Sequence, residues 1–231
     1  MRELARNAAA WLDSTGQLHE AIPFLTRLSE SYRRASENHL AGEARIRVAM
    51  ILYRLGDVEK TAYFAATALG EIDVAREPAL TMAAIHLLLH VLYELDAFDA
   101  ASEQLEQARP MYEEWGGFID RLKARWLEGK IACARGQLAE AEVALGEVRS
   151  EFRTYALPYQ EALVSLDLCG VHLQRGAWAA AQELVQEAHA TFVRVGIERE
   201  ALASVLLLRE ALVGQVATLA LVRRAVAAAA G

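Results

Sequence analysis

A histidine pair within the segment HLLLHVLYE carries the residue types that could bind a metal. His86 and His90 are four residues apart and Glu94 follows four further on, so a helix would place all three on one face. A hydrolytic zinc site also needs a glutamate directly after the first histidine, and Leu87 stands there instead. The three leucines between the histidines indicate a core helix. We therefore predict polar lining of a groove, with no bound metal.

The two cysteines are the other candidates for chemistry. Cys133 or Cys169 beside His172 would have the residue types of a nucleophile and its base. Both cysteines, however, occupy positions of an internal repeat that are otherwise filled by packing residues. The chain also lacks G-x-S-x-G, P-loop, G-x-G-x-x-G and C-x-x-C motifs. We expect neither catalytic residues nor a cofactor, and predict that the protein is not an enzyme.

Composition narrows the classes of partner and the compartment. The net charge is −7 and the pI about 5.5, so binding of nucleic acid by this chain is not expected. Two cysteines form no disulfide framework, and as buried free thiols they favour a reducing compartment. The N-terminal residues do not resemble a secretion signal, and no apolar run is long enough to span a membrane. These observations predict a cytoplasmic protein without membrane association.

A strict internal period organises the chain. The hexamers GQLHEA, GDVEKT, DAFDAA, GQLAEA and GAWAAA begin at steps of 40 residues, at Gly16, Gly56, Asp96, Gly136 and Gly176, and a sixth copy begins two residues early at Gly214. Sixteen residues after each of the five regular marks stands a large apolar or aromatic residue: Tyr32, Ile72, Tyr112, Phe152 and Phe192. Periods of this length are typical of stacked helical repeats.

Each repeat is predicted to hold two helices joined at the mark. The first helix of one unit is expected at about 41–55 and the second at about 58–75, with Gly56 in the left-handed turn between them. Pro78 and Pro158 suit the first turn of a helix. We predict an all-α fold in which one solenoid domain spans 1–231, with antiparallel units at about 1–38, 39–78, 79–118, 119–158, 159–198 and 199–231.

The junction G-x-[LVFW]-x-x-A, followed by an aromatic in the second helix, resembles the tetratricopeptide repeat (TPR) over essentially the whole chain. The usual TPR unit has about 34 residues, and HEAT and armadillo units have about 40–47, so this chain resembles a 40-residue TPR variant. Gly129 matches the family's glycine within the first helix, whereas Ala9, Ala49, Leu89 and Cys169 depart from it and predict looser packing. The resemblance implies a right-handed superhelix.

A narrower resemblance concerns the later repeats. The segment RLKARWLEGKIACARGQLAEAEVALGEVR is similar to the C-terminal TPR region of large bacterial cytoplasmic regulatory proteins, in many of which a DNA-binding or other signalling module precedes the repeats. This resemblance implies that the chain is a sensor or scaffold segment of a larger regulator. No residue here resembles the DNA-binding module itself.

The first helices carry the positions that differ most between repeats. These positions lie 13, 9, 6 and 2 residues before each mark and share one helical face, which we call the stripe. The stripe and its flanking aromatic residues give the candidate partner-binding set: Arg47, Met50, Tyr53, Arg54, His86, His90, Glu94, Lys123, Trp126 and Lys130. The stripe has more cations than acids, so an acidic peptide or a C-terminal carboxylate is the expected ligand. A solvated face of mixed charge is the alternative.

Three functions are compatible with this pattern. The first is a non-catalytic scaffold that holds a peptide or partner segment in a concave groove. The second is a peptide- or ligand-sensing segment of a larger bacterial transcriptional or signalling regulator. The third is a spacer or self-association module, in which Leu206, Leu208 and Leu212 form an exposed end. The sequence leaves the oligomeric state open.

Overall fold

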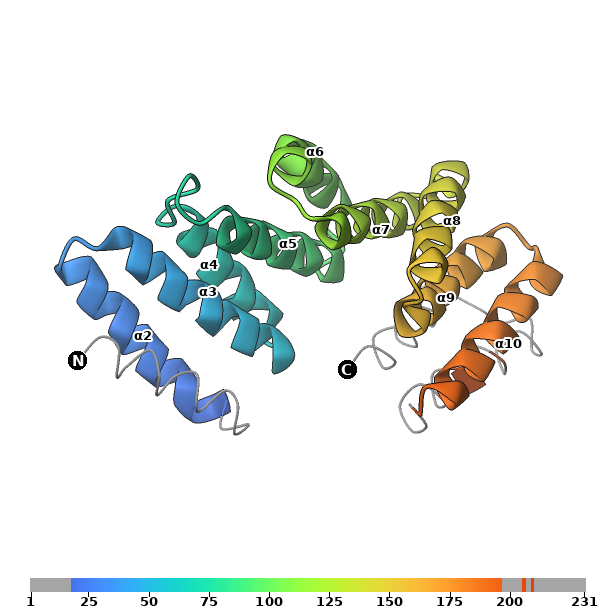
Figure 1. Ribbon diagram of the computed structural model, residues 1–231, viewed down its shortest axis with the longest axis horizontal. Helices are drawn as coiled ribbons and strands as arrows, with labels where there is room; N and C mark the ends of the chain where they lie inside the picture. Colours follow the sequence, from blue (N-terminus) through green and yellow to red (C-terminus); the bar gives the residue numbers. More distant parts are fainter. Residues whose placement is uncertain (1–17, 197–204, 207–208, 210–231) are drawn as a thin grey trace. The chain divides into compact units, whose positions relative to one another are not determined.

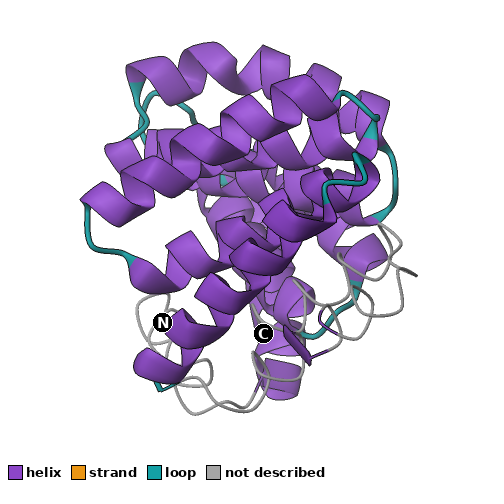
Figure 2. Cartoon of the chain, turned by 90° about the vertical axis from the view of Figure 1, so that its right-hand side faces the viewer, coloured by secondary structure: helices purple, strands orange, loops and turns teal. Residues whose placement is uncertain are grey.

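The computed structural model describes residues 18–196, 205–206 and 209, and that part of the chain contains helices joined by short turns and no strand (Figures 1 and 2). The helices are α2 (Leu18–Arg34), α3 (Asn38–Arg54), α4 (Val58–Leu69), α5 (Pro78–Glu94), α6 (Phe98–Glu114), α7 (Phe118–Ala134), α8 (Leu138–Thr154), α9 (Pro158–Gln174) and α10 (Trp178–Arg194). The predicted all-α repeat architecture is therefore confirmed for these residues.

Helix starts follow the predicted period. The first helices α3, α5, α7 and α9 begin at residues 38, 78, 118 and 158, and the second helices begin at 18, 58, 98, 138 and 178. Pro78 and Pro158 occupy the first turn of their helices, as predicted. The first helix of the second repeat begins at Asn38 rather than near residue 41, and it ends at Arg54 rather than at residue 55.

The chain reverses at each mark through a left-handed residue. Gly56, Gly136 and Gly176 have φ of 75°, 77° and 70°, and Asp96 adopts 58° where glycine is absent. At the first of these turns the amide of Asp57 donates to the carbonyl of Leu52, the closing bond of a Schellman motif. The turn that follows the second helix uses the same geometry at Ser36, Ala156 and Gly196. The sequence pattern did not indicate this second set, because two of the three residues are not glycine.

Helix α4 ends at Leu69, and the prediction of a helix to residue 75 is wrong. The turn after α4 packs onto α3 at Gly42, where an added Cβ would lie 2.8 Å from Cγ1 and 3.0 Å from the backbone nitrogen of Ile72. An Arg45–Glu71 ion pair of 2.5 Å, with side chains 8% and 14% exposed, closes the same contact. The chain thus leaves the helix early, while Ile72 stays buried in its repeat position.

The described residues form two compact units, one that ends at Gly117 and one that begins at Phe118, and each is described by itself. In the N-terminal unit the helices pack in chain order, α2 on α3, α3 on α4, α4 on α5 and α5 on α6, as α7 to α10 do in the C-terminal unit (Figure 1). The aromatic repeat position is buried in both units, which confirms its assignment to the core: Tyr32, Ile72, Tyr112, Phe152 and Phe192 are 1–6% exposed.

The close approach of α7 and α8 depends on a glycine of the first helix. At Gly129 an added Cβ would lie 2.7 Å from Cγ of Leu145, so α7 and α8 approach closely only because the side chain is absent. Leu89 occupies the equivalent position of α5, and α5 packs less closely against α6, as predicted. The same prediction is wrong for Ala49 and Cys169, because α3 packs on α4 and α9 on α10 at least as closely as α7 packs on α8.

Candidate partner-binding site

In the N-terminal unit, α3 and α5 place Tyr53 beside Glu94. The Tyr53 hydroxyl donates a 3.0 Å hydrogen bond to Oε1 of Glu94, and its ring centroid lies 6.1 Å from that of His90. Burial raises the pKa of the Tyr53 phenol above its ordinary value, and the charge and hydrogen bond of Glu94 raise it further. Tyr53 is therefore a neutral hydrogen-bond donor between two consecutive first helices.

The histidine pair continues this row of polar side chains. His90 Nε2 lies 3.2 Å from His86 Nε2, and His86 Nδ1 lies 3.2 Å from the hydroxyl of Tyr112 on α6. Among the residues that the structure describes, no group of three His, Cys, Asp or Glu side chains is arranged to hold a metal ion. The two imidazoles contact each other and Tyr112, while Glu94 is bound by Tyr53.

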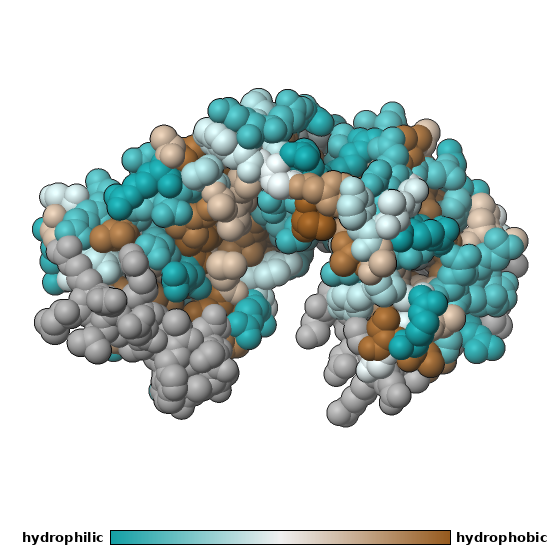
Figure 3. Space-filling view, in the orientation of Figure 1, coloured by the Kyte–Doolittle hydropathy of each residue, from teal (hydrophilic) through white to brown (hydrophobic). Residues whose placement is uncertain are grey.

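Arg47, Met50 and Arg54 lie on the solvent side of α3. Arg47 is bound to Glu43 one turn away at 3.1 Å, and the Arg47 side chain is 40% exposed. Met50 is 48% exposed, and Arg54 is exposed at the last turn of the helix. Figure 3 shows hydrophobic side chains among polar ones over α3 to α5 on the visible face of this unit. Arginine and methionine are both enriched in protein interfaces relative to the rest of the surface.

In the C-terminal unit, α7 and α9 bring Trp126 to Asp167. The indole Nε1 of Trp126 donates a 2.6 Å hydrogen bond to Oδ2 of Asp167, and the indole packs edge-on against Phe152. Asp167 is 8% exposed. Burial raises the pKa of its carboxyl group, and the positive charge of Lys130 and the bond from Trp126 oppose that rise.

Lys123, Lys130 and Cys133 complete this face of α7. Lys123 is exposed and Lys130 is half-buried. The amide of Gln174 on α9 donates to Sγ of Cys133 at 3.0 Å. Burial, assisted by the nearby charge of Asp167, raises the pKa of the Cys133 thiol to about 11. Cys133 and Cys169 are both buried and unpaired, which agrees with the sequence prediction of free thiols.

The structure brings together only part of the predicted set. Tyr53, His86, His90 and Glu94 form one cluster, and Trp126 and Lys130 form another with Asp167. In the four repeats whose first helix the structure describes, the stripe position nine residues before the mark is buried at Leu87, Leu127 and Asp167 and reaches solvent at Arg47. Tyr112 was missed because it comes from a second helix. The equal separation of the bonded pairs, 41 residues, is the signal that would have paired Trp126 with Asp167.

Several predicted positions lie outside the described residues. They are Glu3, Asn7, Ala10 and Ser14 of the first stripe, and Ala9, Gly16, Leu208, Leu212 and Gly214. Leu206, from the predicted exposed end, is 45% exposed. Within the described part of the chain, no helix combines the length and the apolarity that crossing a bilayer requires.

Paired helices in a 40-residue step, with left-handed turns between them, define a TPR-like helical repeat fold. No protein-family model and no curated protein sequence matches the chain. Among solved structures, it is similar to a Rap protein complexed with competence and sporulation factor, with a TM-score of 0.70, 14% identity and coverage of 94% of this chain and 60% of that one. The chain is also similar to the apo form of RapI, with a TM-score of 0.77, 12% identity and coverage of 97% of this chain and 81% of that one.

A Podosopora anserina kinesin light chain with nearly identical TPR-like repeats has a TM-score of 0.62 and 19% identity over 85% of this chain and 95% of that one. At these identities the likeness shows the fold, and it confirms the TPR-like repeat predicted from the Gly–x–apolar–x–x–Ala junctions. The chain spans less than two thirds of the first Rap protein's length.

Proposed function

We propose that this protein is a non-catalytic binding scaffold that holds a peptide or a flexible segment of a partner protein against the first helices. The observation that carries the proposal is the composition of the exposed face of α3, where Met50 and Arg54 reach solvent beside the Tyr53–Glu94 bond. Arginine and aromatic residues contribute strongly to protein interfaces. The buried thiols support a cytoplasmic location, because a reducing compartment keeps them free.

An acidic partner segment is the ligand we propose for this face. Arg47 and Arg54 lie on α3, and Lys123 and Lys130 lie on the equivalent face of α7. A chain with a net charge of −7 repels acidic segments in general, so local cations on the first helices would have to provide the attraction.

Charge reversal tests this function. Partners captured from a cell extract by the wild-type protein are compared with those captured by Arg54→Glu/Lys123→Glu, two exposed positions of the first helices. The matched control is Arg27→Glu/Arg34→Glu, which makes the same charge change on exposed positions of the second helix α2. We expect the first double variant alone to lose its partners. Equal capture by all three proteins would overturn the assignment of the face.

A second candidate function is a peptide-sensing segment of a larger regulator. It is favoured by the fold likeness to a Rap protein whose structure contains competence and sporulation factor. This chain spans 60% of the length of that Rap protein. Sensing requires that a ligand bind two conformations with different affinity. A peptide found in the capture experiment that also changes the X-ray scattering profile of the protein would favour the sensor, and an unchanged profile would favour the scaffold.

A further inference from the structure

Away from the stripe, the C-terminal unit contains a pocket of about 360 Å³ between α8, α9 and α10. Glu161, Ala162 and Ser165 line it from α9, and Arg149 and Arg153 line it from α8. Ser165 is two residues from both Leu163 and Asp167, so it lies roughly 200° around the helix from these stripe residues. The pocket therefore opens on a different face of α9 from the proposed partner-binding site.

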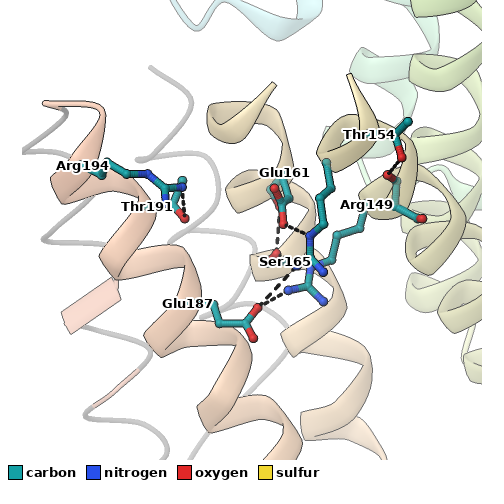
Figure 4. Close-up of polar contacts among 9 residues, drawn as sticks. Arg149, Thr154, Glu161, Ser165, Glu187, Thr191 and Arg194 are labelled. Carbon is teal, nitrogen blue, oxygen red and sulfur yellow. Dashed lines mark hydrogen bonds and ion pairs between the residues drawn. The ribbon is translucent and has the colours of Figure 1, made fainter. Parts of the chain in front are cut away.

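Two of the three arginines in the pocket point to the same carboxylate. Arg149 and Arg153 both direct Nη2 to the same atom, Oε2 of Glu187, and the Arg153 contact measures 3.9 Å. Figure 4 shows the Glu187 carboxylate pointing from α10 toward the arginine side chains. Two guanidinium groups thus meet at a single oxygen atom, an arrangement that suits an oxyanion.

Arg149 is held in place before any ligand arrives. Its Nε donates a 2.8 Å hydrogen bond to Oγ of Ser165, which is 2% exposed and itself donates to the carbonyl of Glu161. The Arg149 side chain is 19% exposed, whereas Glu187 is 59% exposed. The Arg149 guanidinium is fixed, whereas the Glu187 carboxylate bound to it is at the surface. Glu187 is therefore the group that an external anion can replace.

The charge of the pocket favours a doubly negative ligand. Three arginines, Arg149, Arg153 and Arg194, line it together with the two glutamates, and Arg194 is hydrogen-bonded to the hydroxyl of Thr191 at 3.4 Å. Arg153 keeps Glu161 as a partner at 2.7 Å. If Glu187 turns to solvent, two positive charges remain in excess, which matches a phosphate group with a charge of about −1.5 to −2.

We infer that this pocket is a phosphate-binding site in which Glu187 occupies the anion position when no ligand is bound. Arg149 and Arg153 bind the phosphate oxygens, and Arg194 and Thr191 lie at the α10 side of the pocket. The phosphate belongs either to a free small anion or to a phosphorylated side chain of a partner. The inference is independent of the proposed function on the first helices.

Calorimetric titration of the full chain with inorganic phosphate, at constant ionic strength, tests the inference. We expect saturable binding that Arg149→Gln abolishes. Glu187→Gln removes the internal competitor and should tighten binding about twofold to fivefold, the range of one exposed ion pair. Glu142→Gln is the matched control, because it removes an equivalent surface carboxylate bound to Arg175, and it should leave the affinity unchanged.

A second titration with N-acetyl-phosphoserine amide distinguishes the two sources. Tighter binding than that of inorganic phosphate supports a phosphorylated partner, and equal or weaker binding supports a free anion. Melting curves without phosphate show whether Arg149→Gln is folded, and Arg153→Gln replaces it if it is not. The inference is overturned by absence of binding of both probes to the wild type, by unchanged binding in the folded arginine variant, or by weaker binding in Glu187→Gln.

Discussion

Tyr53 and Glu94 are joined across consecutive repeats by a 3.0 Å hydrogen bond between residues 41 positions apart. Trp126 and Asp167 are separated by the same number of residues, and so are Cys133 and Gln174. One repeat plus one residue is therefore the offset at which neighbouring first helices exchange side-chain hydrogen bonds. Residues predicted as anchors for a ligand also hold successive repeats together.

A double-mutant cycle measures the first of these bonds. Tyr53→Phe removes the donor and Glu94→Ala removes the acceptor, and we expect a coupling free energy of about 1 kcal/mol in urea unfolding because the bond is exposed. Tyr53→Phe combined with Glu140→Gln on α8 is the control pair and should show additive effects. A Tyr53–Glu94 coupling no larger than that of the control would contradict a structural role for the bond.

Replacement of two helical glycines by alanine should change the free energy of unfolding in opposite directions. Gly129→Ala forces a Cβ to within 2.8 Å of two Leu145 atoms, so we expect a loss of about 1–3 kcal/mol in the free energy of unfolding. Gly146 in α8 has no atom within 4 Å of an added Cβ, so Gly146→Ala should gain about 1 kcal/mol from helix propensity. Thermal unfolding of both variants checks this pair of signs, and stabilisation by Gly129→Ala would refute the close approach of α7 and α8.

Asp167 gives the protein a stability that depends on pH. Burial raises the pKa of the folded carboxyl above its value of about 3.9 in the unfolded chain. The folded state therefore binds this proton more tightly than the unfolded state. The resulting contribution to stability is complete below the pKa of Asp167 in the unfolded chain and is lost as pH rises through its pKa in the folded protein. Asp167→Asn keeps an acceptor for Trp126 without the buried charge, so it should stabilise the protein at pH 7 and less so as pH falls toward 4.

Asp57 provides a control of opposite sign for that experiment. Its hydrogen bonds with the side chain and amide of Lys60 lower the pKa of this exposed carboxyl group. Asp57→Asn should therefore cost stability at pH 7, and the cost should disappear at acid pH. Urea unfolding across the pH range measures the stability of both variants. If the stability change relative to wild type varied with pH in the same way for both, opposite pKa shifts of the two carboxyl groups would be excluded as the cause.

The thiols should be unreactive while the protein is folded. Burial raises the pKa of Cys133 to about 11 and that of Cys169 to about 12, and the thiolate is the reactive species. At pH 8 we expect both cysteines to react with a disulfide reagent only as fast as the protein opens, and rapidly in urea. Immediate labelling of the folded protein would show that these side chains are accessible.

The helices and the turns that join the two helices of a repeat could be predicted from sequence because their causes are local. The 40-residue step, the left-handed Gly56 and Gly136 and the proline that opens α5 each depend on a few neighbouring residues. The predicted end of the second helix at residue 75, in a region where distant contacts form, was wrong. Helix α4 ends at Leu69 with Gly70 at its C-cap, and the turn after it packs on Gly42 and pairs Glu71 with Arg45, contacts that no local pattern shows.

The amino-acid sequence by itself determined the repeat, the pairing of helices and the face of each first helix that varies. Only the tertiary structure decided which of those residues meet, because the offset of 41 arises from how two helices pack and not from the period of either. The same holds for the burial of Asp167 and for the pocket around Arg149. Three helices form that pocket, so its charges come together only after each helix has packed on the next.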